Sequence, residues 1–324
     1  MPAEPLGLNE HSCDHVQLVF IKRHRGPSLT QKTQVDHVGR AIAWLMLGVT
    51  GGLGLDLCAK EILSTYSLPE FILARSVFGL LIFLILAPRF FGGFKMLRTT
   101  RLGWHLLRTA LAIGAMFGFF YGLSKMPLVN ALTLGFTAPL MVTALSVPFL
   151  GEHVGWRRWA AVVVGFIGTL IMLRPGSGDF SFASFTILVA AFCYACQAIT
   201  ARHLATESTL SLAVYVVAGP LLCAIFLIDG DNWITPDFTG WALMSAAGIC
   251  SAVAWVGFIN GYRGSSPAIL APFEYVALIG GAIAGYLIWD EVPDRWVVIG
   301  AATIIASGLY VVYREIGLKG NVEL

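Results

Sequence analysis

Two charged residues lie inside stretches that are otherwise apolar. Glu274 lies seven residues after Pro267, and Arg108 lies four residues after Trp104. At ~1.5 Å of rise per helical residue, these spacings place both charges ~6 to 10 Å inside the same face of a membrane. An ionisable group at that depth is costly and indicates function by default. We expect Glu274 to bind a cationic or amine group of a solute, or a proton, with Arg108 as competitor or counter-ion. The alternative is a permanent structural ion pair between them.

A second set of charges lies toward the other side of the chain's first two apolar segments. Asp56 and Lys60 are one helical turn apart and are predicted to pair. Arg75 lies deeper in the next segment, where its fixed charge favours a buried role. We expect these three residues to form an outer gate or ion pair. For Lys60, together with Glu61 and Glu70, the alternative is a solvated position at the membrane interface.

Aromatic and amide side chains are the candidates to complete a binding cavity. Phe136 and Tyr275 are 139 residues apart, which is also the spacing of an internal repeat described below. Aromatic walls with a few polar groups suit flat or amphipathic organic solutes. The alternative for each ring is ordinary packing. The further candidates for the cavity wall are Trp44, Tyr194, Gln197, Trp255 and Asn260.

The elements that must position these residues are membrane-spanning helices. Of 324 residues, 57% are hydrophobic and 12% are charged, and the mean hydropathy is +0.76. A soluble domain cannot bury that much apolar surface, whereas a helix of about 20 apolar residues crosses ~30 Å of hydrocarbon and satisfies its own backbone. Ten such segments are predicted, at 41–63, 70–87, 104–123, 128–150, 156–173, 182–200, 210–228, 241–259, 268–289 and 296–312.

The sequence contains an internal repeat. Residues 138–174 and 277–314 share an apolar run, a polar loop with a glutamate, and a second apolar run ending in arginine, with Glu152 and Glu291 at an offset of 139. Each copy ends a five-helix half, and five is odd, so the second half is predicted to lie inverted in the membrane. Paired inverted halves are typical of secondary transporters.

This organisation divides the chain into four parts and orients it. We expect a polar cytoplasmic tail (1–38), two five-helix halves (39–176 and 177–316) and a short cytoplasmic tail (317–324). A cytoplasmic N-terminus leaves few basic residues in outer loops, namely Lys60, Lys125, Arg174 and Arg295. Because basic residues concentrate in inner loops, both termini are predicted in the cytoplasm, with the protein in the cytoplasmic (inner) membrane.

Motifs for other chemistries are weak or missing. The glycines of the first segment lack the strand and the Gly-Lys-Ser/Thr of a phosphate loop, so no nucleotide is expected. Cys193 and Cys196 lie within an apolar segment, where packing is favoured over redox chemistry. We expect no cofactor, no metal ion, no catalytic residue and no nucleic-acid partner. The expected partners are a small-molecule substrate and membrane lipid.

The repeat resembles the drug/metabolite transporter superfamily, specifically chains with two EamA-type domains of five helices each, over roughly residues 39–314. In place of the Leu-Gly-Glu that ends the first copy's helix, the second has Trp-Asp-Glu. The resemblance implies ten helices, cytoplasmic termini and a central cavity between the halves. It rests on Phe149-Leu150-Gly151-Glu152 with Trp159 and Arg174-Pro175-Gly176, on Asp290-Glu291-Val292-Pro293 with Gly308, on Leu73-Ala74-Arg75-Ser76, and on Ala271-Pro272-Phe273-Glu274-Tyr275.

These observations predict an all-α membrane protein with ten transmembrane helices in two inverted five-helix repeats. We expect a secondary transporter, monomeric or homodimeric, that moves a small organic metabolite by alternating access. Members of the superfamily carry amino acids, amines, vitamins and nucleoside-like solutes, riboflavin and S-adenosylmethionine among them. The alternative is an integral membrane enzyme, which is disfavoured because no Ser/His/Asp group, metal-spaced histidines or acidic pair collects at one depth. A passive channel is also disfavoured, because it would need a continuous polar stripe along several helices and the predicted spans show none.

Overall fold

A computed structural model describes residues 29–90, 97, 99–151, 154–174, 181–204, 207–265, 270 and 273–319. All regular elements in these ranges are helical. They are α1 (Leu29–Ile62), α2 (Leu68–Phe90), α3 (Leu102–Leu123), α4 (Leu128–Gly135), α5 (Ala138–Leu150), α6 (Trp156–Leu173), α7 (Phe182–His203), α8 (Thr209–Leu227), the short 3₁₀ helix η2 (Gly230–Asn232), α9 (Phe238–Gly264), α11 (Val276–Trp289) and α12 (Arg295–Lys319).

The described helices have the length and composition of membrane spans. Eight of the spans within the described ranges are long and apolar enough to cross a membrane, with α4 and α5 taken together as 128–150. Helix α11 and the Arg295–Val311 part of α12 are shorter apolar helices. The prediction of an all-α membrane protein is therefore confirmed.

The predicted span 128–150 is not one continuous helix. Helix α4 ends at Gly135, and α5 begins at Ala138 with Pro139 in its first turn. Proline has no backbone N–H to donate and suits the start of a helix, so the new helix begins there. This break matters because it places Phe136 at the junction, where its side chain is not constrained by a regular helix.

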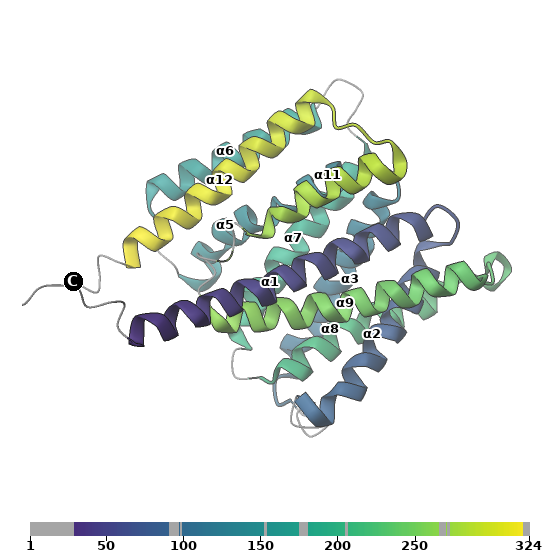
Figure 1. The fold of residues 1–324 in the computed structure, drawn as a ribbon. Helices are drawn as coiled ribbons and strands as arrows, with labels where there is room; N and C mark the ends of the chain where they lie inside the picture. The colour runs from purple at the N-terminus through teal and green to yellow at the C-terminus, as the bar shows by residue number, and fades with distance from the viewer. Residues whose placement is uncertain are drawn as a thin grey trace, which may run out of the picture.

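Helices far apart in sequence pack side by side in three pairs. Helix α1 lies along α9, α3 lies along α7, and α6 lies along α12 (Figure 1). In the first pair, glycines bring the backbones together, since a Cβ added to Gly257 would lie 2.4 Å from the backbone nitrogen of Gly48. Small residues permit such close approach in membranes, where packing rather than the hydrophobic effect holds helices together.

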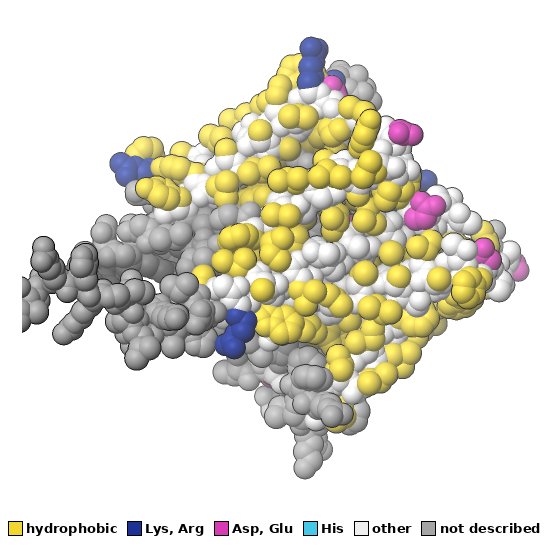
Figure 2. All heavy atoms as spheres, viewed as in Figure 1, with side chains coloured by type: hydrophobic (Ala, Val, Ile, Leu, Met, Phe, Trp, Pro, Cys, Tyr) yellow, Lys and Arg dark blue, Asp and Glu magenta, His cyan; other side chains and the backbone are white. Residues whose placement is uncertain are grey.

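The two ends of the bundle differ. The start of α1 and the end of α12 lie at the same end, on the left of Figure 1, which we call the terminal end. Between the ends, the surface over α1, α9, α11 and α12 is largely hydrophobic, and the acidic side chains visible on this face gather at the opposite end (Figure 2). An apolar surface of this kind is suited to contact with lipid acyl chains.

Two helices separated by the repeat offset end in the same way. Gly151 closes α5 and Asp290 closes α11, both in the left-handed conformation, with φ of 66° and 53°. Each donates its backbone N–H to the carbonyl four residues earlier, Val147 or Tyr286. These positions are 139 residues apart, the predicted offset of the repeat. Glu152, the predicted equivalent of Glu291, lies outside the described residues.

The α1–α9 contact yields a stability prediction. Gly257→Ala should destabilise the protein by about 1–3 kcal/mol, because the new methyl group overlaps the backbone of Gly48. Gly52→Ala is the matched control, since a Cβ there would meet no atom within 4 Å. Both variants gain the same helix propensity. Thermal unfolding in detergent should show a lower Tm for the Gly257 variant only; equal Tm values would contradict the close packing.

Candidate functional site

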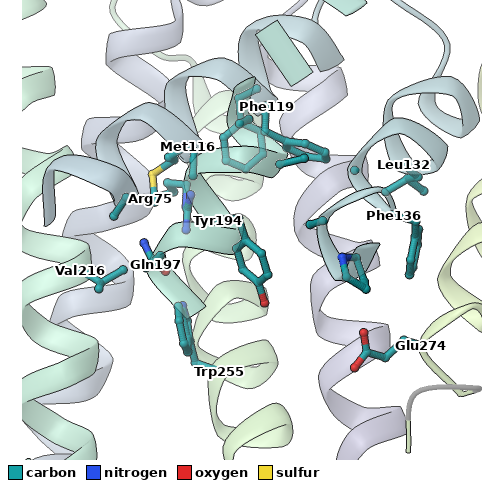
Figure 3. A pocket seen from close by; sticks show the side chains of 18 residues that line it. Arg75, Met116, Phe119, Leu132, Phe136, Tyr194, Gln197, Val216, Trp255 and Glu274 are labelled. Atoms are coloured by element: carbon teal, nitrogen blue, oxygen red, sulfur yellow. The ribbon is translucent and has the colours of Figure 1, made fainter. Parts of the chain in front are cut away.

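A cavity of about 360 Å³ lies among helices from both predicted halves. Helices α2, α3, α4, α5, α7, α8 and α9, together with Glu274 just before α11, contribute to its wall (Figure 3). Most of the wall is apolar or aromatic. Its polar contributors are Arg75, Tyr194, Gln197, Trp255 and Glu274. An apolar enclosure with a few polar groups is the usual form of a site for small organic molecules.

Six of the twelve residues singled out from the sequence as site or gate residues line this cavity, namely Arg75, Phe136, Tyr194, Gln197, Trp255 and Glu274. They come from five different segments of the chain, and the fold brings them to one place. The other six, which are not among the lining residues, are Trp44, Asp56, Lys60, Arg108, Asn260 and Tyr275. Met116 and Phe119 also line the cavity; sequence reasoning missed them because their residue types are common on any apolar helix.

Arg75 forms part of the cavity wall rather than an outer gate. Its side chain is buried, with the residue 4% exposed, and Nη2 donates a hydrogen bond to Ser251 Oγ at 2.9 Å. The guanidinium carbon lies 5.3 Å from the centroid of the Phe120 ring. Within the described part of the chain, its Nε has no hydrogen-bond partner. Arg75 is thus a buried, charged donor group with unused hydrogen-bonding capacity facing a cavity.

Glu274 also faces the cavity, from the residues just before α11 (Figure 3). It forms no ion pair or hydrogen bond with another described residue. The alternative of a permanent ion pair with Arg108 is not observed: Arg108 is buried and donates from Nη1 to the carbonyl of Leu212 at 3.1 Å. Tyr194 lies within electrostatic range of both residues. The two charges were expected at one depth, but equal depth does not specify which way a helix directs a side chain.

The two aromatic residues at the repeat offset are in contact. The ring centroids of Phe136 and Tyr275 lie 5.1 Å apart with an interplanar angle of 30°. Phe136 faces the cavity, whereas the Tyr275 hydroxyl occupies the space above Gly308, where an added Cβ would lie 1.9 Å from it. Tyr275 therefore supports the cavity wall from behind and ties it to α12.

Trp44 and Asn260 take other positions. Trp44 lies on α1 with 37% of its surface exposed, and its carbonyl faces Gly257. Asn260 Nδ2 donates to the carbonyl of Val256, four residues earlier on α9. Neither lines the cavity, so their predicted place in its wall finds no support in this geometry.

A polar cluster closes the end of the bundle that lies away from the termini. Lys60, near the end of α1, forms an ion pair with Glu291 in the α11–α12 loop and donates to the carbonyl of Met126 at 3.1 Å. Glu291 Oε2 accepts the backbone N–H of Leu128 at 2.9 Å. We call Lys60, Glu291, Met126 and Leu128 the end latch. It joins α1, the α3–α4 loop and the α11–α12 loop.

The end latch corrects one prediction. Lys60 was expected to pair with Asp56 one turn earlier, but its ammonium reaches Glu291 and lies 5.1 Å from the Trp289 ring centroid. Asp56 instead lies within electrostatic range of Arg75. An i, i+4 ion pair is weak, so a partner supplied by the tertiary fold readily replaces it.

A second tie at the same end involves a buried acid. Glu70 is 2% exposed and accepts the backbone N–H groups of Ser67 and Ile234, both at 2.8 Å. It therefore links the start of α2 to the α8–α9 loop. Tyr66 adds a hydrogen bond from its hydroxyl to Asp237 at 3.1 Å. Glu70 was considered for a solvated interface position, which this burial contradicts.

The described residues hold no group of three or more His, Cys, Asp or Glu side chains placed to bind a metal ion. Apolar spans, a surface that is largely hydrophobic on the face shown in Figure 2 and a solute-sized internal cavity together define a multi-pass membrane protein that binds small molecules.

Comparison with known proteins gives the family. The EamA-like transporter family matches residues 39–174. The chain is 28% identical to an S-adenosylmethionine uptake transporter of Rickettsia bellii over 277 residues, covering 85% of this chain and 94% of the relative. It is 32% identical to a riboflavin transporter of Vibrio cholerae, covering 68% of this chain and 75% of the relative. A crystal structure at 19% identity matches with a TM-score of 0.58 over 83% of this chain and 96% of its own, which supports the fold.

The chain therefore belongs to the EamA-like transporter family and is a transporter of a small organic metabolite. This confirms the family and the transporter class predicted from the sequence. The relatives are named as transporters, which is consistent with the expectation that this chain is not an enzyme.

The end latch yields a second stability prediction. Glu291→Ala removes the partner of the Lys60 ammonium and of the Leu128 N–H, so it should cost about 1–3 kcal/mol. Glu61→Ala is the control, because the exposed Glu61 accepts a single bond, from Trp289 Nε1 at 3.1 Å. Thermal unfolding should give a clearly lower Tm for the Glu291 variant. Equal shifts would show that the latch contributes nothing beyond a surface hydrogen bond.

Proposed function

We propose that this chain is a secondary transporter of the cytoplasmic membrane that carries its solute through the cavity by alternating access. The moving parts are the two five-helix halves, 39–176 and 177–316, inverted relative to each other. The observation that carries the proposal is the cavity itself, which holds a carboxylate, a guanidinium and several aromatic rings drawn from both halves. Such groups lie inside a membrane mainly where they line a pathway for a polar solute.

The solute in this proposal is a flat, heteroaromatic metabolite. S-adenosylmethionine, which also carries cationic groups, is our leading candidate, and riboflavin, which is uncharged, is the second. Phe136, Tyr194 and Trp255 offer ring faces for stacking. Glu274 lacks an ion-pair partner among the described residues and is available to a cation. The names of the two relatives support this class of solute.

The end latch serves in this scheme as the closed outer gate. It lies at the end away from the termini, and it joins loops and helix ends of both halves. Its rupture would separate α11 from α1 and the α3–α4 loop. With both termini in the cytoplasm, as the distribution of basic residues predicts, the latch faces the outside.

An enzymatic role is the alternative that we set aside. The titratable side chains lining the cavity are Arg75, Tyr194 and Glu274, and they do not form a nucleophile–base pair. A binding role accounts for all three without a reaction. We therefore propose a carrier without catalytic activity.

Glu274 gives the test of this proposal. Purified protein is screened by thermal shift against S-adenosylmethionine, riboflavin, amino acids, polyamines and nucleosides, and each hit is followed as uptake into proteoliposomes. Glu274→Gln should weaken the affinity for a cationic hit about 10- to 100-fold, because the carboxylate loses its negative charge and a charge-assisted hydrogen bond becomes a neutral one. Its Tm without ligand should stay near that of the wild type.

Glu61→Gln is the matched control, since Glu61 lies outside the cavity lining on the exposed end of α1. It should leave binding and uptake unchanged. Unaltered uptake in a folded Glu274→Gln protein would remove Glu274 from the site. Absence of both a thermal shift and uptake for every solute in the panel would contradict the proposed class of cargo.

A further inference from the structure

We propose that Arg75 is an anion-binding residue of the cavity, so that the carried solute bears a carboxylate as well as a cationic group. This rests on the proposed function, because it takes the cavity to be the transport site. It adds to that proposal a chemical requirement: an amphoteric solute whose two charged ends bind at Arg75 and Glu274.

The first support is the incomplete pairing of a buried charge. A guanidinium has five N–H donors, yet the structure gives Arg75 one hydrogen bond, to the neutral Ser251 hydroxyl, and its buried Nε has no partner among the described residues. Burying a charge is costly unless it is paired and hydrogen-bonded. Because Arg75 also lines the cavity, its unused donors are available to a ligand bound there.

Asp56 explains how the charge is tolerated without a ligand. It lies within electrostatic range of Arg75 but outside the distance of an ion pair. When ionised, Asp56 lowers the cost of burying the guanidinium, while the Arg75 donors other than the one bonded to Ser251 stay available. Asp56 is not among the residues that line the cavity, so it does not occupy the position where a carboxylate would bind.

The second support is the place of the two charges. Arg75 comes from α2 and Glu274 from the residues before α11, and Figure 3 shows them on opposite sides of the cavity with Tyr194 between them. Gln197 also lines the cavity and offers an amide donor. A carboxylate and an arginine fork match in geometry, which makes arginine a selective anion receptor.

The third support is the contrast with Arg108. Both arginines are buried and both have an Nε without a partner among the described residues, but Arg108 donates to the backbone carbonyl of Leu212 and is not among the residues that line the cavity. Capping a carbonyl is a structural role. The two residues therefore provide a matched pair, one facing the cavity and one not.

The test combines changes in the residue with changes in the ligand. Binding to the purified full-length protein is measured for two pairs that differ in the carboxylate: S-adenosylmethionine with its decarboxylated analogue, and tryptophan with tryptamine. Wild type should bind the acid of at least one pair more tightly. Arg75→Gln should weaken that acid about 10- to 100-fold and change the decarboxylated partner little.

Two further variants separate charge, geometry and folding. Arg75→Lys keeps the charge without the fork and should recover part of the affinity for the acid. Arg108→Gln should preserve the acid-to-amine affinity ratio of the wild type. The Tm of each variant is measured without ligand. A loss of folding lowers the Tm and weakens binding of both members of a pair equally, so it is distinguished from a selective loss of the acid.

Results that contradict the carboxylate assignment can be distinguished from results that contradict the proposed function. An equal loss for acid and amine in a folded Arg75→Gln protein would overturn the carboxylate assignment. The assignment would also be overturned if the wild type bound none of the four compounds but carried riboflavin, which has no carboxylate. In that case the proposal of a transporter stands and the inference about Arg75 falls.

Discussion

The fold depends on one constraint, which is that the hydrocarbon core offers no water to a polar group. Backbone groups meet it by forming helices, and the described helices accordingly form an apolar bundle. Charged side chains satisfy this constraint in three ways: they pair with an opposite charge, donate to a backbone carbonyl or face an internal cavity. Arg108 caps the carbonyl of Leu212, whereas Arg75 and Glu274 face the cavity. The placement of these charges is what separates structural from candidate functional residues.

The same constraint explains which contacts hold the helices of the bundle together. At the end away from the termini, Lys60 and Glu70 reach partners across loops, and between the segment before α3 and the α7–α8 loop Thr99 donates to Glu207. Within the bundle, close contact rests on small residues, as at Gly48 and Gly257. Hydrogen bonds in water can break and reform, and a glycine contact allows helices to slide past one another. Both features are compatible with the movement that the proposed transport cycle requires.

Much of the fold was predictable from the sequence because its signals are local. Apolar length gives the spans, although 128–150, predicted as one span, is divided into α4 and α5 at Pro139. The recurring loop glutamate predicted a matched pair of helix ends, and Gly151 and Asp290 indeed end their helices alike. The family resemblance, carried by short stretches around these positions, was confirmed by the comparisons.

The site was predictable only in part, because depth along a helix does not fix direction around it. Depth placed Arg108 beside Glu274, but the turn of α3 directs Arg108 toward α8. Local spacing paired Lys60 with Asp56, although its partner is 231 residues away in sequence. Arg75 was expected to be buried, which is confirmed, but the sequence did not show that it lines the cavity. Each of these contacts joins distant segments, for which one sequence carries no direct signal.

The most direct test of the central claim, that the cavity is a water-accessible solute site, is alkylation of a cysteine placed in its wall. In a background with the six native cysteines replaced by serine, Ala115→Cys lines the cavity and Ala110→Cys lies on the exposed outer surface of the same helix. A water-soluble maleimide should label position 115, a transported solute should protect it, and position 110 in lipid should stay unlabelled. No labelling at 115, or labelling that no transported solute prevents, would contradict the claim.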